Sequence, residues 1–264
     1  MGRRKTSPRE SAEDRQISRP RQTKQEGALN EVEISTTQLT PLLRDATLLS
    51  VQQYTMAPKP LLFVASLGNP TSTYAHTLHS AGHTALKSLA LRLRYPSLSP
   101  RSSVSHPSFG RSLPPDSDLS PSEDVASRAT LWMSPVLMNV SGPAVIRAWK
   151  SWLATTEDKG RERKLVIVHD ELEAALGAVK VRAGSLSARG HNGIKSVQGA
   201  LKGMGAAGRQ EFFRIGVGIS RPAGREKDEV SNWVLRKMTP NEAEVLEGEE
   251  VTGRVVDVLS RIGA

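Results

Sequence analysis

Two short, mostly apolar runs that each end in polar residues constrain the fold of this 264-residue chain most strongly. The first, residues 61–66, is followed by Leu67-Gly68-Asn69-Pro70, and the second, residues 165–168, is followed by His169-Asp170-Glu171-Leu172-Glu173. Runs of this length without polar alternation are typical of buried parallel strands, because both faces of such strands are covered. Ligands bind beyond the carboxyl ends of parallel strands, so these polar residues are expected to belong to one site.

Alternating strands and helices are predicted around these two runs. Further short strands are predicted at residues 136–138, 178–182 and 212–219. Apolar residues at helical spacing predict helices at residues 81–91, 143–153 and 194–201. A last helix is expected to begin at Thr239-Pro240-Asn241-Glu242, where Thr and Glu form a capping box. The alternation predicts a single α/β domain with three α/β/α layers and a mostly parallel mixed sheet.

Two segments stand apart from this pattern. Residues 1–58 are polar and rich in Arg, Ser, Thr and Gln, a composition that favours a disordered or targeting extension before a domain at residues 59–264. Early arginines favour a mitochondrial presequence and interspersed acidic residues argue against one, so a mitochondrial and a cytoplasmic location both stay open. Residues 94–130 are dominated by Ser and Pro and are expected to form a flexible insertion.

Composition narrows the classes of function. The formal net charge of +9 fits a polyanionic partner such as nucleic acid. The chain has no cysteine, so disulfides, thiolate metal sites and a cysteine nucleophile are excluded. No run approaches the ~18 apolar residues that cross a bilayer, so no membrane partner is expected.

Five segments, in this order along the chain, resemble the signatures of the bacterial-type peptidyl-tRNA hydrolases, including fungal and organellar members. They are residues 67–70 with Tyr74 and His79, 138–142, 169–173 with Gly177, Lys180 and Arg182, 187–196, and 213–219. The resemblance implies cleavage of the ester between a peptide and the 3′-terminal ribose of tRNA. It also implies that the enzyme needs no cofactor.

His79 and Asp170 have the chemistry that ester hydrolysis requires. Histidine is the side chain best suited to deprotonate water near neutral pH. A carboxylate holds a neutral imidazole in one tautomer and stabilises its charged form, as in hydrolytic triads. A histidine alone is more often a surface or capping residue, but together with Asp170 at a strand end His79 is predicted to be the catalytic base.

Three asparagines, Asn69, Asn139 and Asn192, are predicted to supply neutral hydrogen bonds to water and substrate, because an amide both donates and accepts. A lone asparagine after a strand is usually a turn residue, and three at matched sites are not explained in that way. In the family, the residue matching Asn69 helps to discriminate N-blocked from free aminoacyl ends. Asn69 is therefore grouped with His79 and Asp170, and Asn139 and Asn192 with substrate binding.

Lys180, Arg182 and Arg214 are predicted to hold the acceptor stem of tRNA through its phosphates, with a solvated basic face as the alternative. Tyr74 is predicted to pack against the terminal adenosine of the CCA end, unless it is a core tyrosine. Leu137 occupies a position where the family often has an aromatic residue beside the substrate.

The remaining histidines are not expected to act in catalysis. Those expected to face solvent are His76, His83 and His106, and those expected to be structural neighbours of the site are His169 and His191. No two histidines have the i, i+4 spacing with an intervening Glu that zinc proteases use, so no metal is expected. Ser80 departs from the family pattern, in which Asn usually follows the histidine that matches His79.

Two other functions stay open. A non-catalytic RNA-binding protein of the splicing type has the same fold, and fold does not determine function. A general hydrolase of small esters would act on substrates that lack tRNA. The combination of His, Asp and three Asn favours the enzyme over the binder, and the basic residues favour tRNA over a small ester. We therefore expect a monomeric hydrolase whose substrate is peptidyl-tRNA.

Overall fold

The computed structural model describes residues 58–70, 73–98, 104–105, 120–205 and 212–263. Every element named below belongs to one compact unit, Met56–Ala264. The predicted extension, residues 1–58, lies outside the described residues except for its last one.

A six-stranded sheet forms the centre of this unit, with the strand order β2-β3-β1-β4-β6-β5. The strands are β1 (Leu61–Ser66), β2 (Val104–Ser105), β3 (Ala129–Met133), β4 (Arg163–Glu171), β5 (Val179–Ala183) and β6 (Phe212–Gly218). β1 pairs in parallel with β3 and β4, and β4 pairs in parallel with β6, whereas the edge strands β2 and β5 are antiparallel to their neighbours. The predicted mostly parallel mixed sheet is confirmed. The two apolar runs are its central strands, which explains their lack of polar alternation.

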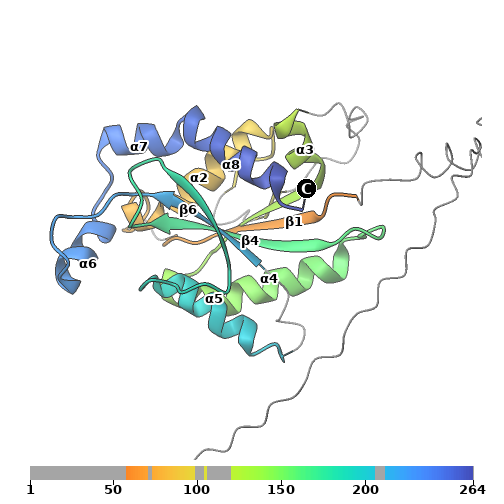
Figure 1. The fold of residues 1–264 in the computed structure, drawn as a ribbon, viewed down its shortest axis with the longest axis horizontal. Coiled ribbons are helices and arrows are strands. Elements are labelled where there is room, and N and C mark those ends of the chain that lie inside the picture. The colour runs from red at the N-terminus through yellow and green to blue at the C-terminus, as the bar shows by residue number, and fades with distance from the viewer. Residues whose placement is uncertain (1–57, 71–72, 99–103, 106–119, 206–211, 264) are drawn as a thin grey trace, which may run out of the picture. The chain divides into compact units, whose positions relative to one another are not determined.

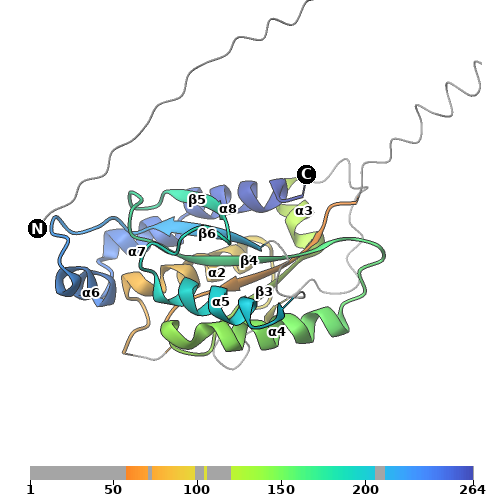
Figure 2. The ribbon, with the colours of Figure 1, turned by 60° about the horizontal axis from the view of Figure 1, so that its bottom comes forward.

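Helices cover both faces of this sheet, as Figure 1 and Figure 2 show. One face carries α2 (Ala81–Arg92), α3 (Pro121–Arg128), α7 (Pro240–Glu247) and α8 (Glu249–Arg261), and the other carries α4 (Ser141–Thr155) and α5 (Asn192–Lys202). Alternate residues of the central strands enter the two cores, Val64 and Val166 on the first face and Phe63 and Ile167 on the second. The short helix α6 (Lys227–Leu235) follows β6. Among the helices of the described ranges, none has the length and apolarity to span a membrane.

The strand predicted at residues 136–138 is wrong. The strand in this part of the chain is β3, which ends at Met133 opposite Ser66 of β1, and the 3-10 helix η3 (Met138–Val140) follows it. Pro135 has no backbone N–H to donate to a neighbouring strand, so the chain leaves the sheet before the apolar residues 136–138.

The prediction of a flexible insertion at residues 94–130 is wrong over its C-terminal part, which forms α3 and the start of β3. α3 begins with a capping box in which the side chains of Ser120 and Glu123 each bond the other's backbone N–H. The same signature predicted the start of α7, where the structure confirms it. The rest of the insertion lies largely outside the described residues, at 99–103 and 106–119.

Arg128, the last residue of α3, joins this helix to the rest of the unit. Its side chain is buried and pairs with Asp124, and its guanidinium donates to the carbonyl oxygens of Pro60, Leu259 and Ser260. Pro60 precedes β1, and the other two carbonyls end α8. Arg128, which falls within the predicted insertion, therefore joins α3, α8 and the segment before β1 at the amino end of that strand.

Candidate active site

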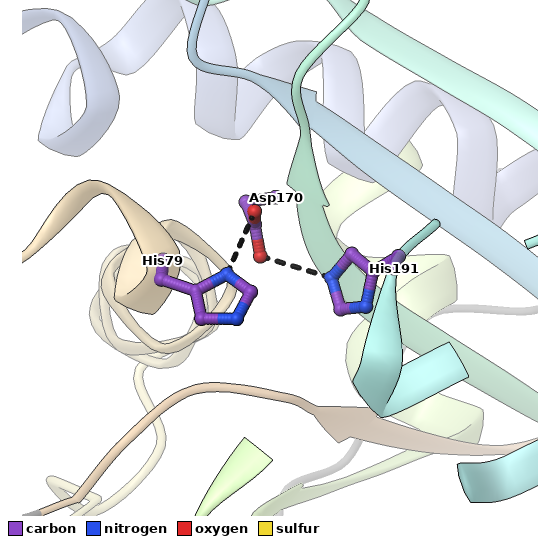
Figure 3. Close-up of side chains that lie close together, drawn as sticks. All are labelled: His79, Asp170 and His191. Carbon is purple, nitrogen blue, oxygen red and sulfur yellow. Dashed lines mark hydrogen bonds and ion pairs between the residues drawn. The ribbon is translucent and has the colours of Figure 1, made fainter. Parts of the chain in front are cut away.

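Two histidines hydrogen-bond the two oxygens of one buried carboxylate at the carboxyl end of β4 (Figure 3). Asp170 Oδ2 lies 3.0 Å from His79 Nδ1, and Asp170 Oδ1 lies 3.0 Å from His191 Nε2. His79 comes from the 3-10 helix η1 (Leu78–Ser80), which leads into α2, and His191 is the N-cap of α5. The structure thus brings together His79 and Asp170, as the sequence predicted, and adds His191 to them.

The N-terminus of α5 determines the tautomer of His191. His191 Nδ1 accepts a hydrogen bond from the backbone N–H of Ile194 at 3.2 Å, so we assign the ring proton to Nε2, which donates to Asp170. The other oxygen of Asp170 accepts from Nδ1–H of His79, which leaves a lone pair on His79 Nε2. An imidazole in this state is able to take a proton from water. His191 is thus a structural neighbour of Asp170, as predicted, and its hydrogen bond orients the carboxylate.

The charges of this group are set by burial and by the histidines together. Burial opposes the ionisation of Asp170, but the two histidines outweigh it and hold the pKa of the carboxyl well below its ordinary value. Burial also lowers the pKa of His79, but the charge and hydrogen bond of Asp170 outweigh it and raise this pKa above 6.5. Asp170 therefore stays charged at neutral pH and stabilises the imidazolium that forms when His79 takes a proton.

Asn69 presents only one end of its amide, because the other end is occupied. Its Oδ1 accepts from the backbone N–H of Met138 at 2.8 Å, so we assign its NH₂ as the group that donates to a ligand. The backbone N–H of Asn69 donates to Ser80 Oγ at 3.1 Å, and Ser80 Oγ donates to the carbonyl oxygen of Tyr74 at 3.1 Å. Ser80, the residue after His79, thus links the backbone of Asn69 to that of Tyr74, a positioning role that sequence reasoning missed. Its departure from the family pattern was the available signal.

Asn139 and Asn192 lie on two short segments that pack against each other. Asn139 belongs to η3, Asn192 is the first residue of α5, and both are exposed. A Cβ at Gly193 would lie only 2.3 Å from Met138 Sδ, so α5 and η3 are in direct contact. Since Met138 also holds Asn69, the segments that carry the three predicted amides meet in one region.

The two predicted apolar contacts lie on the segments that border this region. Leu137 is 43% exposed beside Asn139. Tyr74 is half-buried in the turn before η1, and its carbonyl oxygen accepts from Thr77 as well as from Ser80. Neither side chain belongs to the two cores, so both are accessible to a substrate.

Lys180, Arg182 and Arg214 share one face of the neighbouring strands β5 and β6, because Arg182 is paired with Arg214 and lies two residues from Lys180. Lys180 is exposed, and Arg182 is partly exposed with its Nε 3.6 Å from Glu171 Oε2. Arg214 is only 3% exposed and donates to the carbonyl oxygen of Ser187 at 3.2 Å. Lys180 and Arg182 therefore offer charge to solvent, whereas Arg214 holds the loop before α5 and reaches a phosphate only if that loop moves.

The prediction that His83 faces solvent is wrong. His83 is buried in α2 and shares a hydrogen bond of 2.8 Å with Ser66 Oγ, and burial lowers its pKa to about 3. His169 is buried as well, with Nδ1 2.6 Å from the carbonyl oxygen of Asp170, and burial lowers its pKa to about 3. His76 is exposed, as expected. His106 lies outside the described residues.

His79, Asp170 and His191 have the composition of a metal site, and one ligand atom from each lies within 4.8 Å of the others. A metal ion requires a lone pair on each histidine nitrogen that faces it. The nitrogens that face Asp170 carry protons instead, and α5 fixes this tautomer for His191. The arrangement fits a hydrogen-bonded catalytic group better than a metal centre.

Comparison with known proteins identifies the family. Residues 63–263 match the family model described as Peptidyl-tRNA hydrolase. The chain is 34% identical over 195 residues to the peptidyl-tRNA hydrolase of Saccharomyces cerevisiae, a match that covers 72% of this chain and 91% of that protein. It is 32% identical over 184 residues to the probable peptidyl-tRNA hydrolase of Schizosaccharomyces pombe, covering 70% and 75% of the two chains.

A solved structure supports the same conclusion at the level of the fold. The crystal structure of peptidyl-tRNA hydrolase from Acinetobacter baumannii matches with a TM-score of 0.53 and 24% identity, covering 77% of this chain and 95% of that chain. The family model, which spans residues 63–263, covers the strands and helices that carry the catalytic group. The chain therefore belongs to the peptidyl-tRNA hydrolase family.

Proposed function

We propose that this chain hydrolyses the ester that joins a peptide to the 3′-terminal ribose of tRNA, and so frees the peptide and returns the tRNA to use. The observation that carries this proposal is the geometry of His79, whose Nδ1 is held by buried Asp170 while its Nε2 keeps a lone pair. Membership of the peptidyl-tRNA hydrolase family supports peptidyl-tRNA as the substrate.

The reaction needs only water and the side chains of this group. His79 Nε2 takes a proton from water as the water oxygen bonds to the ester carbonyl carbon, and the carbonyl electron pair moves to its oxygen. Asp170 stabilises the resulting imidazolium. As the electron pair returns, the bond to the ribose 3′-oxygen breaks, and His79 gives the proton to that oxygen. The products are the peptide acid and a tRNA with a free 3′-hydroxyl.

The amide residues orient the reactants. The NH₂ of Asn69 is a donor held in a fixed direction, so we assign it to the attacking water. Exposed Asn139 and Asn192 bind the peptide part of the substrate, with Leu137 beside it. Tyr74 packs against the terminal adenosine of the CCA end.

The exposed cations bind the acceptor stem. Lys180 and Arg182 contact its phosphates, and Arg214 joins them when the loop at Ser187 shifts. Phosphate contacts position tRNA without reading its sequence, which suits an enzyme that must accept many tRNAs. Such contacts weaken with salt, because binding releases counterions from the nucleic acid.

The decisive experiment measures the release of labelled peptide from purified peptidyl-tRNA at two salt concentrations. We expect turnover by the wild type, a loss of about 10²–10⁴-fold in His79→Ala, and a KM that rises with salt. The matched control is His76→Asn, because His76 is exposed in the turn just before η1 and Asn tolerates its positive φ of 60°.

The same experiment separates the alternatives. Binding of tRNA without release of peptide would support the RNA-binding protein, and cleavage of a small ester that lacks tRNA would support the general hydrolase. Full activity of His79→Ala would remove the basis of the proposed mechanism.

We also propose that the protein acts as a monomer, in the mitochondrion or the cytoplasm, on peptidyl-tRNA that ribosomes have released prematurely. A catalytic group whose residues can all be supplied by one chain is compatible with a monomer. Light scattering of the purified protein tests the monomer, and cell fractionation with N-terminal sequencing tests the compartment.

A further inference from the structure

His83 is a buried titratable residue for which the proposed mechanism has no use. It lies in the first turn of α2, four residues after His79, and is 5% exposed. Its Nδ1 bonds Ser66 Oγ, and the backbone of Gly68 and of Ser134 also interacts with the ring. A histidine this buried stays neutral, so its contribution must come from shape and hydrogen bonding rather than charge.

The ring of His83 lies against Gly68, the residue before Asn69. A Cβ on Gly68 would lie 2.5 to 2.9 Å from three atoms of the His83 ring, which are its three nearest neighbours. Gly68 is not among the glycines with a positive φ, so its backbone would accept alanine. The histidine ring therefore excludes a side chain at position 68, and the backbone conformation does not.

The same turn of α2 is packed tightly onto the strand ends. A Cβ on Gly82 would lie 2.6 Å from the carbonyl oxygen of Leu67 and 2.7 Å from that of Val168. From the other side, Ser80 holds the backbone N–H of Asn69. The turn that carries Asn69 thus lies between Ser80 and His83, both from the segment that begins with His79.

We propose that His83 is a positioning residue that sets the placement of Asn69 relative to His79, by packing against Gly68 and bonding Ser66. The inference rests on the proposed function, in which Asn69 and His79 act on the same water. Removal of the ring lets the turn at Gly68 relax into the space that is left. A displacement of about 1 Å between reacting groups is enough to lower kcat about 100-fold, while the tRNA contacts on β5 are unchanged.

The test is a cycle of three variants assayed on peptidyl-tRNA, namely His83→Ala, Gly68→Ala and the two together. His83→Ala empties the space beside Gly68. Gly68→Ala adds a methyl group that clashes with the His83 ring. In the double variant the methyl group has room, so the two changes should compensate. We expect each single variant to lower kcat about 10- to 100-fold at unchanged KM, and the double to be at least about 5-fold faster than the slower single variant.

Ser66→Ala is a milder second variant, because it keeps the ring and removes only its hydrogen bond. We expect a fall in kcat of about 3-fold, again at unchanged KM, which decides the matter if His83→Ala does not fold. Thermal melting of each variant reports whether the fold is intact.

Three results would overturn the inference while leaving the proposed function intact. These are a wild-type kcat in the folded His83→Ala variant, a double variant no faster than the slower single one, and an effect confined to KM. Wild type and His79→Ala are assayed alongside. Absence of peptide release by the wild type itself would instead overturn the proposed function, and the role of His83 with it.

Discussion

The replacement Asp170→Asn tests the catalytic group sharply, because it preserves the shape of the side chain and changes its hydrogen bonding. The carboxylate offers two acceptors, whereas an amide offers one acceptor and one donor. His191 must donate through Nε2, since its Nδ1 accepts from Ile194. The amide oxygen of the variant therefore turns to His191, and its NH₂ turns to His79.

This orientation forces His79 into the tautomer that cannot act as a base. The NH₂ donates to Nδ1, so the ring proton moves to Nε2, where the water needs a lone pair. The opposite orientation places NH₂ against Nε2–H of His191, an unsatisfied buried contact that costs about 1–3 kcal/mol. That energy corresponds to about 5- to 150-fold fewer molecules with the working tautomer.

Loss of the negative charge adds to this effect, because burial then lowers the pKa of His79 without opposition from a carboxylate. Together the two effects should lower kcat/KM about 10²–10⁴-fold. The assay is single-turnover release of labelled peptide from peptidyl-tRNA, followed across pH.

A second substitution tests the reason for the loss. His191→Asn removes the Nε2 donor and keeps a side chain that caps α5. In an Asp170→Asn background it frees the amide to turn its oxygen toward His79, so part of the lost rate should return. Wild-type activity in Asp170→Asn, or no recovery in a folded double variant, would refute the tautomer reasoning.

Four further outcomes are expected. Wild-type kcat/KM should fall as the pH drops through the pKa of His79, which is raised above 6.5, because the base must be neutral to act. A pH–rate profile locates the midpoint of this fall, and a midpoint below 6.5 contradicts the prediction. Asn69→Asp keeps an acceptor and removes the donor, so kcat should fall about 10²–10³-fold in steady-state assays, and an unchanged kcat would exclude the donor role. Arg182→Ala should raise KM and lower the salt slope of binding by about one unit, whereas Arg261→Ala, an exposed arginine at the end of α8, should do neither. Arg128→Met leaves Asp124 with Lys59 as its remaining ion-pair partner and removes the donor to three backbone carbonyl oxygens. Urea titration should therefore show a free energy of unfolding lower by about 1–3 kcal/mol, and an unchanged midpoint would contradict this.

Local patterns in the sequence predicted the elements whose signals are local. Continuous apolar runs identified β1 and β4, because a strand covered on both faces needs no polar alternation. The capping box at Thr239 identified the start of α7, because its hydrogen bonds lie within one turn. The same signature at Ser120 would have identified α3 inside a segment that composition assigned to a flexible insertion.

Local patterns failed where distant residues decided the outcome. Residues 136–138 are as apolar as a short strand, but β3 ends earlier because its register with β1 runs out at Met133. His83 is a polar residue on a helix, and nothing near it in sequence shows that Ser66 and Gly68 enclose it. Arg214 matches a cation of the family pattern, yet the loop at Ser187 covers it.

The sequence alone determined the residues available for catalysis, since the motif spacing selected His79 and Asp170 among all the histidines and carboxylates of the chain. Only the tertiary structure decided how they act, because hydrogen-bond direction depends on partners that are distant in sequence. Asp170 holds both His79 and His191, Met138 orients the amide of Asn69, and these contacts exist only after β4, η3 and α5 have packed together. The residue types thus indicate the kind of reaction, and the fold determines the protonation of the histidines and the orientation of the Asn69 amide.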